Sequence, residues 1–165
     1  MILSVEYVLD IEGEHLNFTG ELDLQAVKRH GETLFHKLLA VDGAVRNQAG
    51  VVTLRYQISG DLQYLCDRCL MQTTKPISKT FEHTVVRSLV DEQLDDVFLV
   101  VPHGKMDLTE IASSDLLLYL PQALLCGENC KGLCSVCGAD LNETSCGCQT
   151  PKVDAGLSLL KELLD

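Results

Sequence analysis

The residues of this chain with the clearest chemistry are its eight cysteines, which occur as four close pairs. The pairs are Cys66/Cys69, Cys126/Cys130, Cys134/Cys137 and Cys146/Cys148, and the last three lie in the stretch CGENCKGLCSVCGADLNETSCGC. A two-residue spacer places two sulfurs on one side of a tight turn, and two such turns can surround a tetrahedral ion at about 2.3 Å from each sulfur. The spacing therefore predicts metal ligands, and zinc is the ion that suits them best.

Disulfides fit this pattern less well than metal coordination. Cys146 and Cys148 could hardly bridge each other without strain, because a disulfide needs a Cα separation of roughly 4.4–6.8 Å and a fixed dihedral angle. The first residues, MILSVEYVLDIEGEH, contain neither a basic segment nor a clean apolar segment of the kind that directs secretion. We therefore expect a cytoplasmic protein in a reducing environment, where free thiols persist.

The cysteine-rich stretch has too few apolar side chains to hold one shape alone. Its larger non-cysteine apolar residues are Leu133, Val136 and Leu141, each stabilising by roughly 1.5–3 kcal/mol if fully buried. Ordering a segment of this length costs on the order of 30 kcal/mol. A structural zinc site contributes roughly 10–16 kcal/mol in small peptides, so metal together with docking onto the rest of the chain would close most of the gap.

Eight thiols allow two four-cysteine sites. We expect a local site made by Cys134, Cys137, Cys146 and Cys148, and a long-range site that joins Cys66 and Cys69 to Cys126 and Cys130. One site plus spare buried cysteines remains an alternative, as does a redox-active CxxC pair. Gly138 follows Cys137, where a thiolate-binding turn often needs a positive φ. Leu70 occupies that place after Cys69, which favours a different turn for the first pair.

The charge of the chain restricts its partners. The formal net charge is −11, and two four-thiolate zinc sites would bring it to about −15. Such a protein does not attract nucleic acid in general, and a basic protein is the more natural partner. Residues 51–90 alone are net positive, with five Lys or Arg against three Asp or Glu. Possible RNA contacts there are Arg68, Lys75, Lys79 and Arg87; a solvated strand face is the alternative.

Alternating residues Val52, Leu54, Tyr56 and Ile58 predict a half-buried strand, with residues 77–88 as its partner and Cys66/Cys69 near the hairpin tip. Further strands are expected at 1–10, 16–24, 34–46 and 97–101, a turn at 47–50 and an acidic loop at 91–96. A helix is expected at about 107–120, capped by Asp107 and ended by Pro121.

The fold class that follows is α+β: an antiparallel β-sheet or partly open barrel with a few helices and a small cysteine-rich knob. The expected domains are a β-rich core at 1–125, the zinc-binding knob at 126–150, and a C-terminal helix at 151–165 that packs on the core. Sequence motifs for an enzyme are missing, since there is no Gly-rich phosphate loop and no GxSxG motif. The five histidines are scattered without ligand spacing, and all-cysteine zinc sites are usually closed to substrate.

Three segments together resemble the YceD family: CDRCL at 66–70, the helix that ends in Leu120-Pro121, and CKGLCSVCGADLNETSCGC at 130–148. These bacterial proteins are described as large ribosomal RNA subunit accumulation proteins. The resemblance implies a role in large-subunit ribosomal RNA processing or accumulation, and no known enzymatic activity.

We therefore expect a zinc-stabilised, non-enzymatic factor in large ribosomal subunit biogenesis that binds a basic ribosomal protein or ribosomal RNA of the pre-ribosome. No small-molecule substrate and no membrane are expected. A cytosolic thiol redox sensor and a zinc reservoir are the alternatives.

Overall fold

The computed structural model describes residues 1–88 and 98–148, and the chain divides into two compact units. The first unit comprises Met1–Tyr64 and Thr73–Gln122, and the second comprises Leu65–Gln72 and the chain from Ala123 onward. The turn that carries Cys66 and Cys69 thus belongs to the same unit as the other six cysteines.

Two predicted elements cannot be compared with the structure. The acidic loop at 91–96 and the C-terminal helix at 151–165 lie outside the described residues. Of the strand predicted at 97–101, the structure describes β8 (Phe98–Val100).

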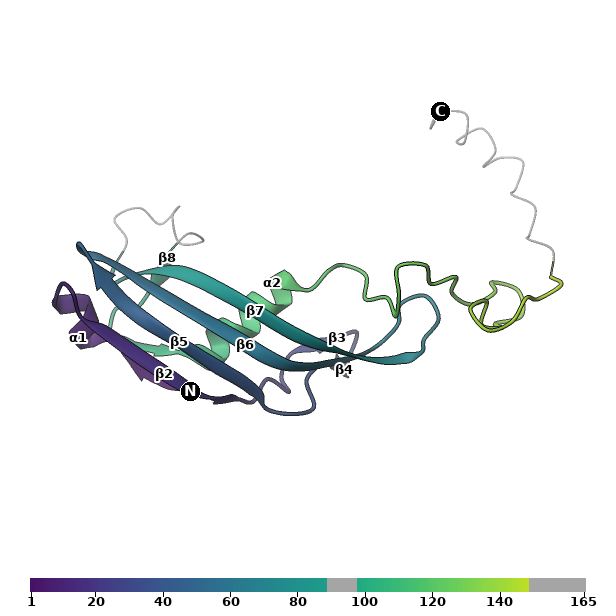
Figure 1. Ribbon diagram of the computed structural model, residues 1–165, viewed down its shortest axis with the longest axis horizontal. Coiled ribbons are helices and arrows are strands. Elements are labelled where there is room, and N and C mark those ends of the chain that lie inside the picture. Colours follow the sequence, from purple (N-terminus) through teal and green to yellow (C-terminus); the bar gives the residue numbers. More distant parts are fainter. Residues whose placement is uncertain (89–97, 149–165) are drawn as a thin grey trace, which may run out of the picture. The chain divides into compact units, whose positions relative to one another are not determined.

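A five-stranded sheet forms the main part of the first unit, in the order β2-β5-β6-β7-β8 (Figure 1). Its other strands are β2 (His15–Leu22), β5 (Leu39–Gln48), β6 (Val51–Leu65) and β7 (Gln72–Val86). β5 is antiparallel to β2 and β6, whereas β8 runs parallel to β7. The predicted β-rich α+β class is confirmed. Among the described residues the two edge strands, β2 and β8, do not pair, so the sheet is open and not a closed barrel.

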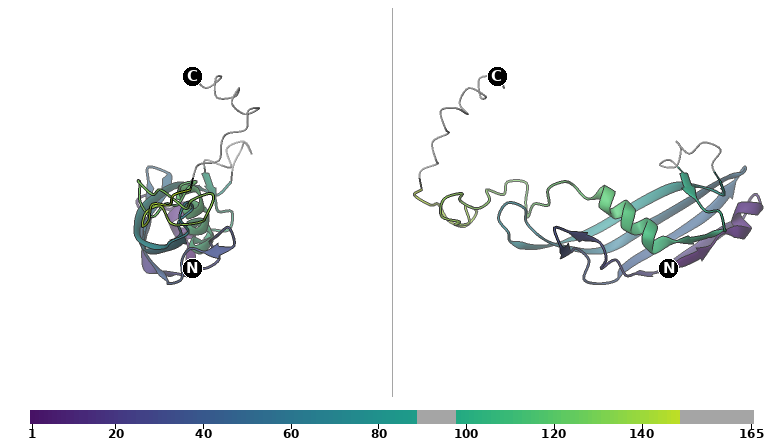
Figure 2. Two further views of the ribbon diagram at one scale, coloured as in Figure 1. Left: turned by 90° about the vertical axis from the view of Figure 1, so that its right-hand side faces the viewer. Right: turned by 180° about the vertical axis from the view of Figure 1, so that it is seen from behind.

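The core of the first unit lies on one face of this sheet. The predicted alternation in β6 is confirmed, because Val52, Leu54, Tyr56 and Ile58 are all buried. Helix α2 (Leu108–Tyr119) lies along one side of the sheet (Figure 2), and its side chains at Leu108, Ala112 and Leu116 are buried. This spacing of four places them on one face of the helix, as burial against a sheet requires.

The predicted cap of α2 is also present. The Asp107 side chain accepts a hydrogen bond from the Thr109 backbone N–H at 2.9 Å, which satisfies one of the free donors of the first turn. Leu120 ends the helix with extended dihedral angles, immediately before Pro121. None of the helices in the described part of the chain is long and apolar enough to cross a membrane.

The first ten residues differ from the predicted strand. Only β1 (Ile2–Ser4) is extended, paired with β9 (Lys105–Asp107), and it is followed by the short helix α1 (Glu6–Asp10). Val5 and Val8 are both buried. Their three-residue spacing suits one turn of helix and not a strand, so the break in alternation after Val5 marked the change of structure.

The strand predicted at 34–46 begins later and ends later, as β5. Leu34 is buried without being part of this strand; its N–H bonds to the Val27 carbonyl at 3.2 Å. The predicted turn at 47–50 contracts to Ala49 and Gly50, with φ of 52° and 81°. A two-residue turn with both φ values positive matches the twist of the two strands it joins. Between β2 and β5 the chain also forms the two-stranded ribbon β3 (Lys28–Arg29) and β4 (Glu32–Thr33).

Candidate metal centre

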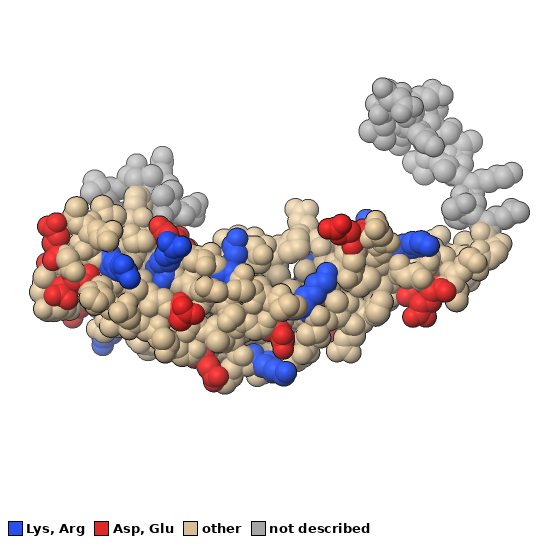
Figure 3. Space-filling model, viewed as in Figure 1, with Lys and Arg blue, Asp and Glu red and all other residues tan. Residues whose placement is uncertain are grey.

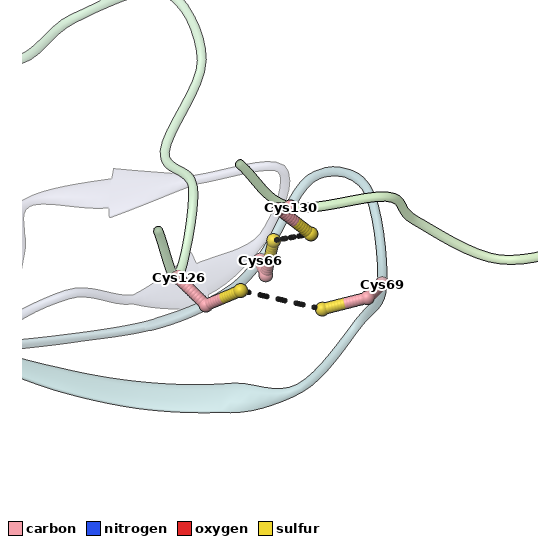
Figure 4. Close-up of side chains that lie close together, drawn as sticks. All are labelled: Cys66, Cys69, Cys126 and Cys130. Carbon is pink, nitrogen blue, oxygen red and sulfur yellow. Dashed lines mark hydrogen bonds between the residues drawn. The ribbon is translucent and has the colours of Figure 1, made fainter. Parts of the chain in front are cut away.

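The long-range group of cysteines assembles from two places in the chain. Cys66 and Cys69 lie in the turn between β6 and β7, and Cys126 and Cys130 lie in the segment that follows α2 (Figure 4). The Cys66 and Cys130 sulfurs are 3.7 Å apart, and those of Cys69 and Cys126 are 3.6 Å apart. A tetrahedral ion with sulfurs at 2.3 Å separates them by about 3.8 Å. The donor set therefore fits a four-coordinate ion of zinc size.

Backbone contacts hold the two cysteine segments together. The Asp67 N–H donates to the Leu124 carbonyl at 2.9 Å, and the Leu124 N–H returns a bond to the Asp67 carboxylate at 2.7 Å. Within the turn, the Leu70 N–H donates to the Cys66 carbonyl at 2.9 Å. These bonds hold the two segments in the arrangement in which their four sulfurs converge.

Burial and local dipoles act differently on the thiols of this group. Burial opposes ionisation of Cys66, but backbone N–H groups of Cys126, Cys69 and Arg68 outweigh it and lower the pKa of its thiol to about 6. The Met71 backbone favours the Cys69 thiolate, yet burial and the neighbouring thiols raise its pKa to about 12. A site that combines an easily ionised thiol with thiols of raised pKa would release protons when it binds a cation.

The local group contains Cys134, Cys137, Cys146 and Cys148. Its four sulfurs lie within 4.8 Å of one another, as do those of the long-range group. The Cys134 sulfur accepts from the Val136 N–H at 3.4 Å, and the Gly138 N–H donates to the Cys134 carbonyl at 2.9 Å. Backbone N–H groups of Cys137 and Val136 lower the pKa of Cys134 to about 6. This is the geometry of a thiolate held in a tight turn.

The two groups differ most in exposure. Cys66, Cys69 and Cys130 are buried, whereas Cys137 and Cys148 are exposed. All eight cysteines are free, without disulfides. The structure thus gathers the eight sulfurs into the two sets that the spacing predicted, one buried and one open to solvent.

A non-cysteine residue that sequence reasoning missed connects the two groups. The Asn142 amide donates to the Cys130 sulfur at 3.5 Å, and its oxygen accepts from the Lys131 N–H at 2.8 Å. Asn142 belongs to the segment between the two pairs of the local group, but it contacts a sulfur of the long-range group. Hydrogen bonds to a thiolate stabilise its charge and orient it. No spacing rule could have identified this contact, since it depends on how the segment folds back.

The four predicted RNA-contact residues each make a separate contact within the chain. The Arg68 guanidinium donates to the Cys130 carbonyl at 3.0 Å, and the Arg68 carbonyl accepts from the Leu133 N–H, so this residue links the cysteine segments. In the first unit, Lys79 lies 4.7 Å from the centre of the Tyr119 ring, and Arg87 pairs with Asp10.

Lys75 lies over the ring of Tyr64, in the same unit. The face drawn in Figure 3 carries basic side chains interspersed with acidic ones. An RNA contact by these residues stays a prediction.

A second polar cluster was not anticipated from the sequence. Asp115 of α2 accepts a hydrogen bond from the Tyr56 hydroxyl of β6, and its carboxylate lies 2.6 Å from Nε2 of His83 on β7. The hydrogen bond to Asp115 raises the pKa of His83 against the effect of burial. Burial and the same carboxylate raise the pKa of Tyr56. The cluster fastens the helix to two strands through one carboxylate.

The fold and site together define a class: a β-rich protein with a helix on its sheet and two cysteine tetrads able to hold metal ions. The chain belongs to the YceD family. The family model described as "Large ribosomal RNA subunit accumulation protein YceD" matches residues 54–164, which includes both tetrads. The resemblance noted from the sequence is thereby confirmed.

A curated relative supports the same placement. The chain is similar to the "Uncharacterized protein YlbN" of Bacillus subtilis (strain 168), with 26% identity over 125 residues, which cover 75% of this chain and 73% of the relative. No solved structure matches the chain.

Proposed function

We propose that this protein is a zinc-stabilised, non-enzymatic factor in large ribosomal subunit biogenesis, acting in the cytoplasm by binding a basic ribosomal protein or ribosomal RNA. The observation that carries the proposal is the match to a family described by its role in large-subunit ribosomal RNA accumulation. The two tetrads support the zinc part, and the net charge of −11 supports a basic protein as the partner.

Zinc would be held by two sets of four sulfurs, one from Cys66, Cys69, Cys126 and Cys130 and the other from Cys134, Cys137, Cys146 and Cys148. The ion would supply the free energy that the small apolar content of the second unit cannot, roughly 10–16 kcal/mol per structural site. The chain's own contribution is to aim the sulfurs, through the Asp67–Leu124 bonds at one site and the Cys134 turn at the other.

Metal content and thiol reactivity test the zinc part directly. Purified full-length protein should contain two zinc ions per chain and no rapidly alkylated thiol. One ion with four free thiols would reduce the proposal to a single site, and folded metal-free protein with disulfides would contradict it. Chelation should abolish amide-exchange protection across residues 126–148, and unchanged protection there would remove zinc as the stabilising element.

The ribosomal part is tested by depletion and by pull-down. Cells that lack the protein should accumulate less mature large-subunit ribosomal RNA than small-subunit RNA, and the wild-type gene should restore the ratio. A tagged chain should retain large-subunit components at physiological salt, and RNase treatment separates a protein partner from an RNA partner. An unchanged ratio on depletion together with no retained ribosomal component would remove the proposed function.

Exposure of the local tetrad supports a second candidate, a zinc reservoir. Cys137 and Cys148 are exposed, so a competing ligand can approach this ion more readily than one in the buried tetrad. A reservoir should transfer one ion per chain to a weak chelator within seconds and keep the other. Equal retention of both ions would leave only the structural role.

A further inference from the structure

The turns that follow Cys66 and Cys134 have the same local geometry with different residues. In each, the residue after the second cysteine donates its N–H to the carbonyl of the first cysteine at 2.9 Å: Leu70 to Cys66, and Gly138 to Cys134. Both residues have positive φ, 59° for Leu70 and 73° for Gly138. The expectation of a different turn around Leu70 is therefore wrong, because leucine adopts the left-handed conformation that glycine usually supplies.

Leucine is a poor choice for this conformation by itself. Its Cβ crowds the backbone when φ is positive, whereas glycine and asparagine tolerate such angles. A core contact could compensate, but the Leu70 side chain is 60% exposed. Neither backbone geometry nor burial among the described residues explains a leucine here. An exposed apolar side chain that a strained backbone holds in place is well suited to contact with another molecule.

Leu70 does not stand alone. Met71 follows it, and Leu65 precedes the cysteines of the same turn; each of these two is 44% exposed. We call Leu65, Leu70 and Met71 the hairpin-tip surface. Backbone bonds from Leu70 N–H to the Cys66 carbonyl and from Cys66 N–H to the Met71 carbonyl hold the turn, so this apolar surface is presented on a rigid support. Rigid presentation reduces the entropy lost on binding.

The charge of the unit that carries this surface restricts what could dock on it. The described residues of the second unit carry four acidic and two basic side chains, namely Asp67, Glu128, Asp140, Glu143, Arg68 and Lys131. Two four-thiolate zinc sites would make the unit more negative still, by about −2 each. Such a unit repels phosphate and attracts cationic side chains.

We propose that the hairpin-tip surface docks a basic protein segment, with Leu70 inserted between apolar side chains of the partner and acidic side chains of the same unit pairing with the partner's lysines or arginines. This rests on the proposed function only in taking the partner to be a protein of the large subunit. It names the binding element, and it makes the partner a protein and not RNA.

The test uses the zinc-loaded full-length chain and variants chosen to keep the turn intact. Leu70→Gly and Leu70→Asn both suit a positive φ, and both remove the apolar side chain. Leu118→Gln is the matched control, because Leu118 of α2 is the most exposed large apolar residue described, at 85%, and lies in the first unit. Zinc content and melting temperature of each variant establish that it is folded.

Each immobilised protein is offered two probes: large-subunit ribosomal proteins freed of RNA, and large-subunit ribosomal RNA freed of protein. Wild type and Leu118→Gln should retain at least one basic ribosomal protein equally, and both Leu70 variants should bind it about tenfold more weakly, as loss of one buried leucine side chain implies. If all four proteins retain the ribosomal protein equally, the proposal is overturned and the proposed function stands. If they retain only the RNA, the proposal is likewise overturned and the proposed function likewise stands.

Stronger retention by the Leu70 variants also overturns it, since the chain would then cover the surface itself. If wild type retains neither probe, the direct-binding part of the proposed function fails together with this proposal.

Discussion

Asn142 offers a sharp test of how the cysteine groups are built, because it is not a ligand in either group. Its amide donates to the Cys130 sulfur at 3.5 Å, and its oxygen accepts from the Lys131 N–H at 2.8 Å. Asn142→Ala removes both bonds, together with the bond from its amide to the Asp140 carboxylate at 2.7 Å. A hydrogen bond to a charged acceptor contributes about 1.5–3 kcal/mol, and loss of such a partner weakens metal affinity about 10–100-fold. We therefore expect a loss of that size at the long-range tetrad.

The assay is chelator titration with alkylation read residue by residue. In Asn142→Ala, alkylation of Cys126 and Cys130 should begin at a chelator concentration about 10–100-fold lower than in wild type. The matched control is Asn129→Ala, since Asn129 lies between these two ligands in sequence and is exposed. The control should behave as wild type. Identical curves for both variants, or an effect of Asn142→Ala confined to the local tetrad, would refute the reasoning.

Three further outcomes follow from the structure. His83 has a raised pKa in the folded state. Its pair with Asp115 therefore contributes its full stabilisation of the folded state below about pH 6.5, and this contribution is lost as the pH rises through the folded pKa. The free energies of urea unfolding of wild type and His83→Gln should differ more at about pH 6 than at about pH 8. Leu70→Gly should raise the unfolding free energy by up to about 1 kcal/mol, because relief of positive-φ strain exceeds the added chain entropy, and a lowered melting temperature would contradict this. Cys66→Ser should expose more of residues 126–148 to amide exchange than Cys148→Ser, because Cys66 is buried and Cys148 is exposed. Equal exchange in the two variants would contradict a larger structural role for the buried tetrad.

Local patterns in the sequence were sufficient for several features. Alternation over Val52–Ile58 identified a strand, because side chains point to opposite faces at every second residue. Asp107 and Pro121 bounded a helix, because each acts on the backbone within one turn of itself. The close cysteine pairs indicated turns that converge sulfurs. These features depend only on neighbours in the chain.

Where a local pattern changed partway, the sequence was misleading. The apolar residues near the N-terminus predicted one strand, but the pairing partner of β1 is the distant β9 and is only three residues long. Leu34 fitted an extended pattern, although it is buried outside the strand. Apolar burial alone does not distinguish a strand from a turn that folds back, since both remove the side chain from water.

What the amino-acid sequence determined by itself was local: which cysteines form close pairs, which residues alternate along β6, and where α2 begins and ends. What only the tertiary structure decided was how distant segments meet. The contact of Asn142 with Cys130 and the use of one Asp115 carboxylate by Tyr56 and His83 both depend on the chain's path through space. Long-range contacts of this kind arise only after the loops between them have closed, and no periodicity in the sequence records that closure.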